Sequence, residues 1–305
     1  MKIALCFLIS GKHEINKELL WKDWIEENKD IINVYFHYTD HSKIESKWIK
    51  NNCIPSKYIV KTDYLHVVPA YMSLLKYAMV VDPTNEWFCF LTESCAPVVC
   101  PSIFRQKFFT HYSQSIMRWK PSWWNVQSQK RANLRFLQKD YHLANTPWFI
   151  LNKYHAQICI KYMNVNSKIY NLICSGDVGN ESVFAIIFKA DRTLDNVLNE
   201  ETTVTDWDRM MSATSPYLFS ESTDHNTQFV EKYMDEDKNA LFIRKIDKTF
   251  PDETLLDFAK RQELTCSRPY MLLDLINVSR KKQLELLEYV SYLDLYVTRI
   301  IKKMN

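Results

Sequence analysis

Glycine is scarce in this sequence, with only three in 305 residues: Gly11, Gly176 and Gly179. Closely spaced glycines build the phosphate-binding loops of dinucleotide and P-loop enzymes, and neither GxGxxG nor GxxxxGK occurs. Their absence argues against ordinary NAD-binding enzymes and P-loop enzymes. HExxH and comparable metal-ligand spacings are missing as well, so the sequence indicates no metal site of these types.

Two further absences concern the cysteines and the apolar runs. None of the eight cysteines forms a CxxC pair, so neither a zinc ribbon nor a thioredoxin-type centre is indicated. Cys6, Cys89 and Cys159 lie inside apolar runs, and we expect free thiols in a reducing compartment. No window reaches the about 20 apolar residues of a membrane span, and no cleavage site follows the apolar N-terminus. We therefore expect a cytoplasmic protein without a membrane span.

Neither sign of charge is in large excess, because 39 Lys and Arg stand against 36 Asp and Glu. The formal net charge of +3 is too small to indicate a nucleic-acid partner by itself. An apolar fraction of 47% and a charged fraction of 25% are ordinary for a soluble globular protein. The length suffices for one large domain or two small ones.

Strand and helix patterns alternate through the first part of the chain. Apolar runs at Lys2–Ser10, Ile32–Tyr38 and Glu86–Leu91 predict strands, and we expect a further short strand near Ile59. Helical spacing relates the intervening apolar residues Leu20, Trp21, Trp24, Ile25, Leu74, Leu75 and Ala78. This alternation predicts an α/β fold with a mostly parallel central sheet flanked by helices.

Ligands of such sheets bind beyond the carboxyl ends of the strands. The loops at Ser10–Lys12 and Thr92–Ser94 are therefore expected to hold a ligand, which makes Ser10, Gly11 and Glu93 candidate binding residues.

The end of the chain follows a different pattern. Past Pro251 the sequence is helical in character, and Leu284, Leu287, Val290, Leu293 and Val297 recur at helical spacing. We expect one catalytic domain at 1–260 and a C-terminal helical tail at 261–305, through which two copies of the chain could associate.

The segment 173–184, ICSGDVGNESVF, contains two of the three glycines just before Glu181. If ESVFAIIF is helical, Asn180 is the expected N-cap and Glu181 lies in the first turn. The helix dipole would then keep the carboxylate ionised, so that it could act as a base. The alternative is an ordinary acidic residue at a helix start.

Two other elements carry charges that suit a phosphate-linked ligand. Asp206-Trp207-Asp208 has the DxD form that many sugar-nucleotide enzymes use for a metal ion, although so short a pattern also arises by chance. Arg244 and Lys245, with Lys248 nearby, could neutralise a pyrophosphate without a metal. They could equally be the solvated end of a strand.

The polar and aromatic stretch from Arg118 to Asn152 includes MRWKPSWWNVQSQKRANLRF. Basic residues interleaved with tryptophan could bind a nucleic-acid strand, form an amphipathic surface, or line a channel for an anionic or sugar ligand. A partly buried excursion packed on the sheet is the structural alternative.

Five of these segments, in this order, resemble the core-2/I-branching β-1,6-N-acetylglucosaminyltransferase family, above all its plant branch of unknown function. VVDPTNEWFCFLTESCAPV resembles the signature DPxNExFxLLSExCxPL, and ANTPWFILNKYHA resembles GSQWFxxxRxxA. GNESVF, TVTDWDR and ALFIRKID match the elements DExYFPT, TYVDWSR and LFARKF. The resemblance covers about residues 1 to 260.

The resemblance implies a GT-A-like nucleotide-sugar fold and an inverting, metal-independent transfer. It implies that Glu181 is the catalytic base, that Lys245 binds the donor diphosphate, and that Trp207 lines the acceptor site. With these we group Arg244, Ser10, Gly11 and Glu93 at the donor, and Arg209 and Trp148 at the acceptor.

Two departures from the family pattern stand out. Asn180 replaces the first acid of the DE element, and the family's second cation is absent from SATSPYLFSESTDHNTQF, so Arg244 or Arg209 would have to replace it. We therefore expect an inverting glycosyltransferase that moves a GlcNAc-like or xylose-like sugar from a nucleotide-diphosphate donor, which we expect to be UDP-linked, to a glycan hydroxyl. No cofactor is expected. The alternatives are an inactive carbohydrate-binding or scaffold protein and a nucleic-acid-binding module built on Arg118–Arg135.

Overall fold

A six-stranded sheet forms the centre of the computed structural model, which describes residues 1–9, 11–237 and 239–265. Its strand order is β2-β1-β3-β8-β5-β9, and every strand except β8 runs in the same direction. The strands are β1 (Lys2–Leu8), β2 (Ile32–His37), β3 (Asn85–Thr92), β5 (Ser115–Ile116), β8 (Ile150–Asn152) and β9 (Val197–Leu198). The predicted fold class, a mostly parallel sheet flanked by helices, is confirmed.

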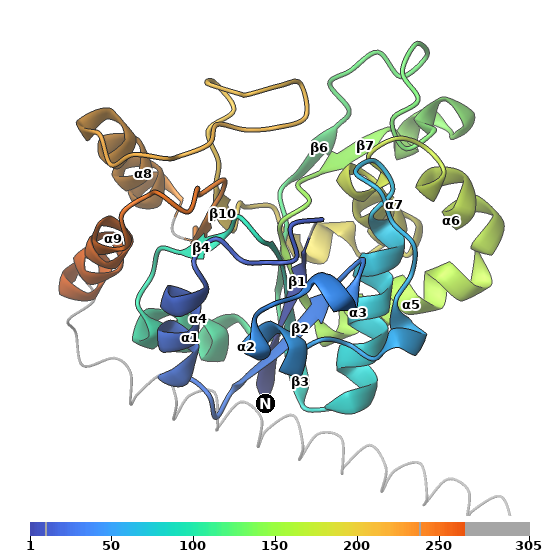
Figure 1. The fold of residues 1–305 in the computed structure, drawn as a ribbon. Helices are drawn as coiled ribbons and strands as arrows, with labels where there is room; N and C mark the ends of the chain where they lie inside the picture. Colours follow the sequence, from blue (N-terminus) through green and yellow to red (C-terminus); the bar gives the residue numbers. More distant parts are fainter. Residues whose placement is uncertain (10, 238, 266–305) are drawn as a thin grey trace, which may run out of the picture.

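The three strongest apolar runs form the parallel core of this sheet. β1 lies between β2 and β3, with Ile3 opposite Ile32 and Ala4 opposite Phe88. Because all three strands run in parallel, their carboxyl ends lie at one edge of the sheet, which is the upper edge in Figure 1.

The prediction of a short strand near Ile59 is wrong. The chain forms a 3-10 turn there, η2 (Ser56–Tyr58), in which the Tyr58 N–H donates to the Pro55 carbonyl at 2.8 Å. Proline at the start favours this turn, because its ring presets φ and it has no N–H to donate to a neighbouring strand.

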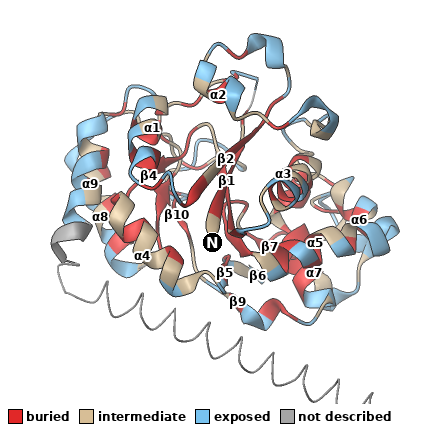
Figure 2. Cartoon of the chain, turned by 90° about the horizontal axis from the view of Figure 1, so that it is seen from below, coloured by how far each residue is buried: buried red, intermediate tan, exposed pale blue. Residues whose placement is uncertain are grey.

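Helices cover both faces of the sheet, and Figure 2 shows the buried sheet between them. On one face lie α1 (Glu18–Glu26), α2 (Lys47–Asn51) and α4 (Pro101–His111). On the other face lie α3 (Val68–Val81), α5 (Lys153–Val165), α6 (Ser167–Cys174) and α7 (Val183–Ala190). Alternate residues of β1 and β3 supply the two cores, as expected for a strand that is buried on both sides.

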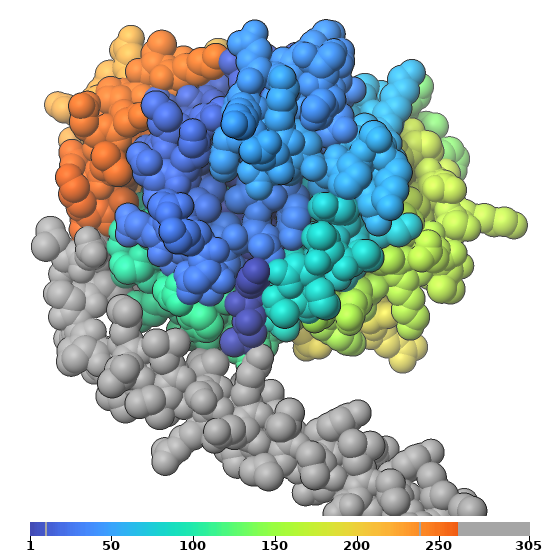
Figure 3. Space-filling model, turned by 60° about the horizontal axis from the view of Figure 1, so that its bottom comes forward, coloured from blue at the N-terminus to red at the C-terminus, as the bar shows by residue number. Residues whose placement is uncertain are grey.

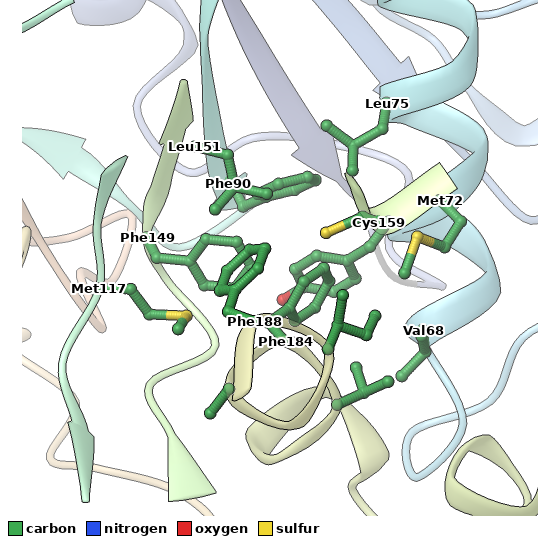
Figure 4. Packing of buried hydrophobic residues seen from close by; sticks show 14 of the residues in the cluster. Val68, Met72, Leu75, Phe90, Met117, Phe149, Leu151, Cys159, Phe184 and Phe188 are labelled. Carbon is green, nitrogen blue, oxygen red and sulfur yellow. The ribbon is translucent and has the colours of Figure 1, made fainter. Parts of the chain in front are cut away.

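The core beneath α3 and α7 is rich in aromatic rings. Figure 4 shows Phe90 of β3 close to Phe149, Phe184 and Phe188. The Phe149 and Phe184 ring centroids are 4.6 Å apart. This packing fixes the start of α7, and with it the loop that carries Glu181, against the sheet.

A third, smaller layer lies beside α1. It contains a three-stranded sheet with the order β10-β11-β4 and its own apolar core. Its elements are β4 (Ala96–Pro97), β10 (Thr203–Val204), β11 (Phe242–Ile243), α8 (Asp224–Glu236) and α9 (Asp252–Thr265). Figure 3 shows the orange surface of this layer against the blue N-terminal part of the chain.

The boundary expected at residue 260 falls inside α9, and the predicted helical tail lies, from residue 266 onward, outside the described residues. None of the helices in the described ranges is both long and apolar enough to cross a membrane.

The remaining elements surround the carboxyl edge of the main sheet. A two-stranded hairpin forms from β6 (Trp119–Pro121) and β7 (Leu143–Asn145). The short 3-10 turns are η1 (His41–Lys43), η3 (Leu134–Phe136), η4 (Lys139–Tyr141), η5 (Gly179–Glu181) and η6 (Leu194–Asn196). The stretch from Arg118 onward is therefore an ordered excursion that projects above this edge (Figure 1).

Candidate active site

A cavity of about 420 Å³ opens at the carboxyl ends of β1, β2 and β3. Gly11 lines it from the loop after β1, His37 and Thr39 from the end of β2, and Thr92 and Glu93 from the end of β3. The cavity thus lies where the sequence places a ligand site, with Gly11 and Glu93 on its wall. Ser10, which was expected beside them, lies outside the described residues.

His37 gives this part of the wall a neutral surface. Burial lowers the pKa of its imidazole to about 4, and its Nε2 accepts a hydrogen bond from the Val60 N–H at 3.3 Å. The ring is therefore uncharged at neutral pH.

Segments that are far apart in the sequence complete the cavity. Trp148 lines it from the turn before β8, Asn180 and Glu181 line it from η5, and Arg244 lines it from the end of β11. The predicted base and one of the two predicted cations therefore share one cavity.

The local structure around Glu181 differs from the expected helix start. Residues Gly179–Glu181 form a 3-10 turn, and α7 begins at Val183 with Ser182 at its N-cap position. Asn180 is not the N-cap; its carbonyl accepts a hydrogen bond from the Asn145 side chain at 2.9 Å. Since Glu181 precedes α7, the predicted stabilisation of its charge by the first turn of that helix is wrong.

The Glu181 carboxylate instead has an arginine partner, Arg131, from the excursion between β6 and η3. Both side chains are mostly buried, with 14% of Glu181 and 17% of Arg131 exposed. Burial raises the pKa of the Glu181 carboxyl, and the positive charge of Arg131 offsets part of that rise. Arg131 is not among the residues that line the cavity, whereas Glu181 is.

Gly176 explains how Arg131 reaches Glu181. A Cβ atom at this position would lie 2.3 Å from the Asn133 backbone nitrogen and 2.7 Å from the Lys130 carbonyl oxygen. The Ala132 N–H also donates to the Asp177 carbonyl at 2.8 Å. Glycine is therefore required for close approach of two backbones, whereas the left-handed conformation in this loop belongs to Val178, with φ of 46°.

Arg131 was not predicted from the sequence as a site residue. Its guanidinium lies 4.6 Å from the Trp124 ring centroid, which holds it in place through a cation–π contact. The dense basic and aromatic pattern around Trp123 and Trp124 was visible in the sequence. Its pairing with Glu181, fifty positions away, depends on how the two loops dock.

Arg244 contacts the cavity differently, because its partners carry no charge. It donates to the Thr92 hydroxyl and to Ser94 Oγ at 2.5 Å, and its guanidinium lies 4.7 Å from the Trp148 ring centroid. No carboxylate of the described ranges forms an ion pair with it, and its buried Nε has no hydrogen-bond partner there. The cation is thus prepared for an anion that the protein itself does not supply.

Lys245 lies beside this wall without lining it. Its Nζ donates to Ser215 Oγ at 2.8 Å, and the preceding residue, Thr214, is on the cavity wall. Burial, followed by the neighbouring charge of Arg244, lowers the pKa of the Lys245 ammonium, while Glu93 acts in the opposite direction.

The three residues predicted for the acceptor are separated by the structure into two groups. Trp148 and Trp207 are stacked, with ring centroids 6.4 Å apart and an angle of 22° between the planes. Trp207 is 40% exposed, so its ring offers a surface to a ligand. Arg209 does not line the cavity: its Nε donates to Asp206 at 2.6 Å and its Nη1 donates to Asn226 at 2.9 Å.

These contacts also describe the DxD element. Asp206 is only 2% exposed and is engaged by Arg209, which packs over the Tyr217 ring at 4.0 Å. Within the described ranges, no group of three or more His, Cys, Asp or Glu side chains is placed to hold a metal ion. Of the two arginines that could replace the missing family cation, Arg244 is therefore the one at the cavity.

The fold and the cavity are those of an α/β protein with a ligand site at the carboxyl ends of parallel strands, lined by Glu181 and Arg244. The sequence comparison makes the class specific. Residues 5–242 match the model of the family described as Core-2/I-Branching enzyme, and the chain belongs to this family. The protein is therefore a member of a glycosyltransferase family, whose substrates are a nucleotide sugar and a glycan acceptor.

No curated protein matches the chain. Among solved structures it is similar to the crystal structure of 4-diphosphocytidyl-2C-methyl-D-erythritol synthase from Anaerococcus prevotii, with 14% sequence identity and a TM-score of 0.31. That similarity covers 64% of this chain and 96% of the other.

Proposed function

We propose that this protein is an inverting, metal-independent glycosyltransferase. It transfers a GlcNAc-like or xylose-like sugar from a UDP-linked donor to a hydroxyl of a glycan. The observation that carries the proposal is the cavity that both Glu181 and Arg244 line. Arg244 has no ion pair with a carboxylate of the described ranges. A base and a cation are the two groups that such a transfer requires at opposite ends of the reacting bonds.

Glu181 acts as the general base. The acceptor hydroxyl loses its proton to the carboxylate as its oxygen attacks the anomeric carbon of the donor. The bond from that carbon to the diphosphate oxygen breaks with its electron pair leaving on the diphosphate, and attack from the opposite side inverts the configuration. General-base assistance of this kind is worth about 10² to 10⁴ in rate.

Arg131 supports this step through its ion pair with the Glu181 carboxylate. Burial favours the protonated acid, which cannot accept a proton, and the guanidinium counteracts that effect. Arg131 is thus a positioning residue that keeps Glu181 ionised and holds its orientation toward the cavity.

Arg244 neutralises the diphosphate, and Lys245 joins it when the loop at Thr214 adjusts to the donor. The loops that begin at Gly11 and Thr92 hold the nucleotide, and the exposed face of Trp207 stacks on the acceptor sugar. No cofactor beyond the nucleotide sugar takes part in this mechanism. The seven described cysteines are all free thiols, which fits the cytoplasmic location that we propose.

One experiment tests the assignment directly. The purified protein is first screened by thermal shift against UDP-GlcNAc, UDP-xylose and other nucleotide sugars, because a selective donor raises the melting temperature. Donors that bind are then assayed for transfer and hydrolysis with and without EDTA. Turnover that persists in EDTA supports the proposal. Binding without turnover would favour an inactive carbohydrate-binding protein, and inhibition by EDTA that Mn²⁺ reverses would overturn metal independence.

A further inference from the structure

One long stretch of the chain contains no acidic residue. Asp and Glu make up 36 of the 305 residues, yet none occurs from position 94 to position 139. The second half of this stretch carries six cations, namely Arg118, Lys120, Lys130, Arg131, Arg135 and Lys139. Folded surfaces normally intersperse the two signs of charge, so a segment with one sign indicates a field that serves a partner.

These cations belong to the excursion that carries β6 and η3, above the edge of the sheet where the cavity opens (Figure 1). Lys120, Lys130, Arg135 and Lys139 are exposed. None of these four forms an ion pair with a carboxylate in the described ranges. The other two cations are paired: Arg118 lies 3.8 Å from a Glu201 carboxylate oxygen, and Arg131 pairs with Glu181, a contact that joins the excursion to the proposed base.

Exposed aromatic rings accompany the cations. Trp123 is 61% exposed and Phe136 is 59% exposed. The Lys120 ammonium lies 4.4 Å from the Trp123 ring centroid, and the Arg135 guanidinium lies 4.7 Å from that of Phe136. A surface of this composition suits a ligand that offers both an apolar face and a negative charge.

A sugar ring that carries a carboxylate, sulfate or phosphate has both features. Its C–H face can stack on an indole, and its anion can pair with Lys or Arg. Single-stranded nucleic acid is also bound by stacking and cations. The position of the surface favours the glycan, because the ion pair between Arg131 and Glu181 joins the excursion to the loop that carries the proposed base.

We propose that the acceptor is an anionic glycan and that Lys120, Lys130 and Arg135, together with Trp123, bind its charged sugars beyond the residue that is modified. This inference rests on the proposed function for its placement. It adds the chemical class of the acceptor, which neither the cavity nor the family specifies.

The test measures binding by fluorescence anisotropy with end-labelled octasaccharides on the full-length protein. A heparin octasaccharide supplies carboxylates and sulfates, isomaltooctaose is the neutral probe of equal length, and the oligonucleotide dT8 is the nucleic-acid probe. We expect the heparin octasaccharide to bind at least about tenfold tighter than either, with an affinity that falls steeply as salt rises.

A variant with Lys120→Gln, Lys130→Gln and Arg135→Gln should weaken heparin binding at least about tenfold. Its matched control is Lys50→Gln, Lys76→Gln and Lys161→Gln, which removes the same charge from exposed, unpaired lysines of α2, α3 and α5. Trp123→Ala tests the ring separately. Circular dichroism and melting temperature establish that each variant is folded.

Equal binding of the neutral and anionic octasaccharides, or equal losses in the two triple variants, would overturn the inference. Tighter binding of dT8 than of heparin would replace the glycan with nucleic acid. Glu181→Gln separates this inference from the proposed function. If that variant binds heparin normally but the wild type transfers no sugar, the proposed function fails while the cationic surface for an anionic glycan stands.

Discussion

Glu181 and Arg244 line the same cavity, yet their surroundings differ in one respect. The carboxylate of Glu181 is paired with Arg131, which does not line the cavity. The guanidinium of Arg244 is held by two hydroxyls and an indole ring, all of them neutral. One of these partly buried charges is therefore balanced by an opposite charge, and the other has no such partner in the described ranges.

The different partners of Glu181 and Arg244 lead to a prediction for the role of each residue. An unbalanced buried charge costs free energy, and an anionic ligand at Arg244 would recover that cost on binding. The charge of Glu181 is already offset by Arg131, so it does not require an anionic or cationic ligand, and the carboxylate can accept a proton. We therefore predict that Arg244 binds substrate and that Glu181 takes part in proton transfer.

The substitution Glu181→Gln should have the largest effect and is the strongest test of the difference between Glu181 and Arg244. The amide keeps the shape of the side chain but cannot accept the acceptor proton, so kcat should fall by about 10² to 10⁴. The affinity for UDP, measured by calorimetry, should remain within about twofold, because the proposed partner of the diphosphate is Arg244 and not Glu181. Full turnover in this variant would remove Glu181 from the mechanism.

The second largest effect should come from Arg244→Met. Loss of charge-assisted hydrogen bonds worth about 1.5–3 kcal/mol should weaken UDP binding by roughly 10- to 100-fold. Lys248→Gln is the control, because Lys248 is an exposed neighbour that pairs with Glu14 and does not line the cavity. Equal UDP affinities in the two variants would contradict the proposed role of Arg244.

A smaller and more specific effect is expected from Arg131→Gln. Burial raises the pKa of Glu181 and Arg131 lowers it, so removal of the arginine should raise that pKa further. The base is active only when deprotonated. The acid limb of the kcat/KM profile should therefore move to higher pH, with activity lost at low pH and regained as pH rises.

Arg131→Lys restores the charge and should return the acid limb toward its original position. A uniform loss of activity at every pH, without a shift of the limb, would mean that Arg131 acts only in folding.

The smallest effect, on stability, should come from Gly176→Ala. The added methyl group would collide with the backbone at Lys130 and Asn133, and such overpacking costs about 1–3 kcal/mol. Gly11→Ala is the matched control, because no atom lies within 4 Å of the added carbon. Chemical denaturation of both variants should show a loss for Gly176→Ala only; equal unfolding free energies would show that the two loops separate easily.

The sequence specifies the central strands well because their signal is local. The apolar run at Lys2–Leu8 can satisfy its burial only in the middle of a sheet, and β1 lies there. Near Ile59 a similar local signal is misleading, because Pro55 favours a 3-10 turn. The presence of Glu181 and Arg244 at one cavity follows from family motifs rather than from spacing.

The partner of Glu181 could not be read in the same way. Arg131 becomes its neighbour only after two loops dock, and the docking depends on the absence of a side chain at Gly176. The helix-cap interpretation of Asn180 relied on local propensity, and the tight packing of α7 moved the helix start to Val183. Long-range docking therefore decides the electrostatics of this site.

The backbone contact at Gly176 separates two evolutionary constraints. The excursion that carries Trp123 is held to the loop of Glu181 by backbone hydrogen bonds at Asp177 and by the ion pair of Arg131, while the Trp123 ring is largely exposed. Drift in exposed side chains of the excursion could retune which acceptor is recognised without disturbing the reacting groups. Chemistry and substrate choice would then be inherited as independent traits on a single chain.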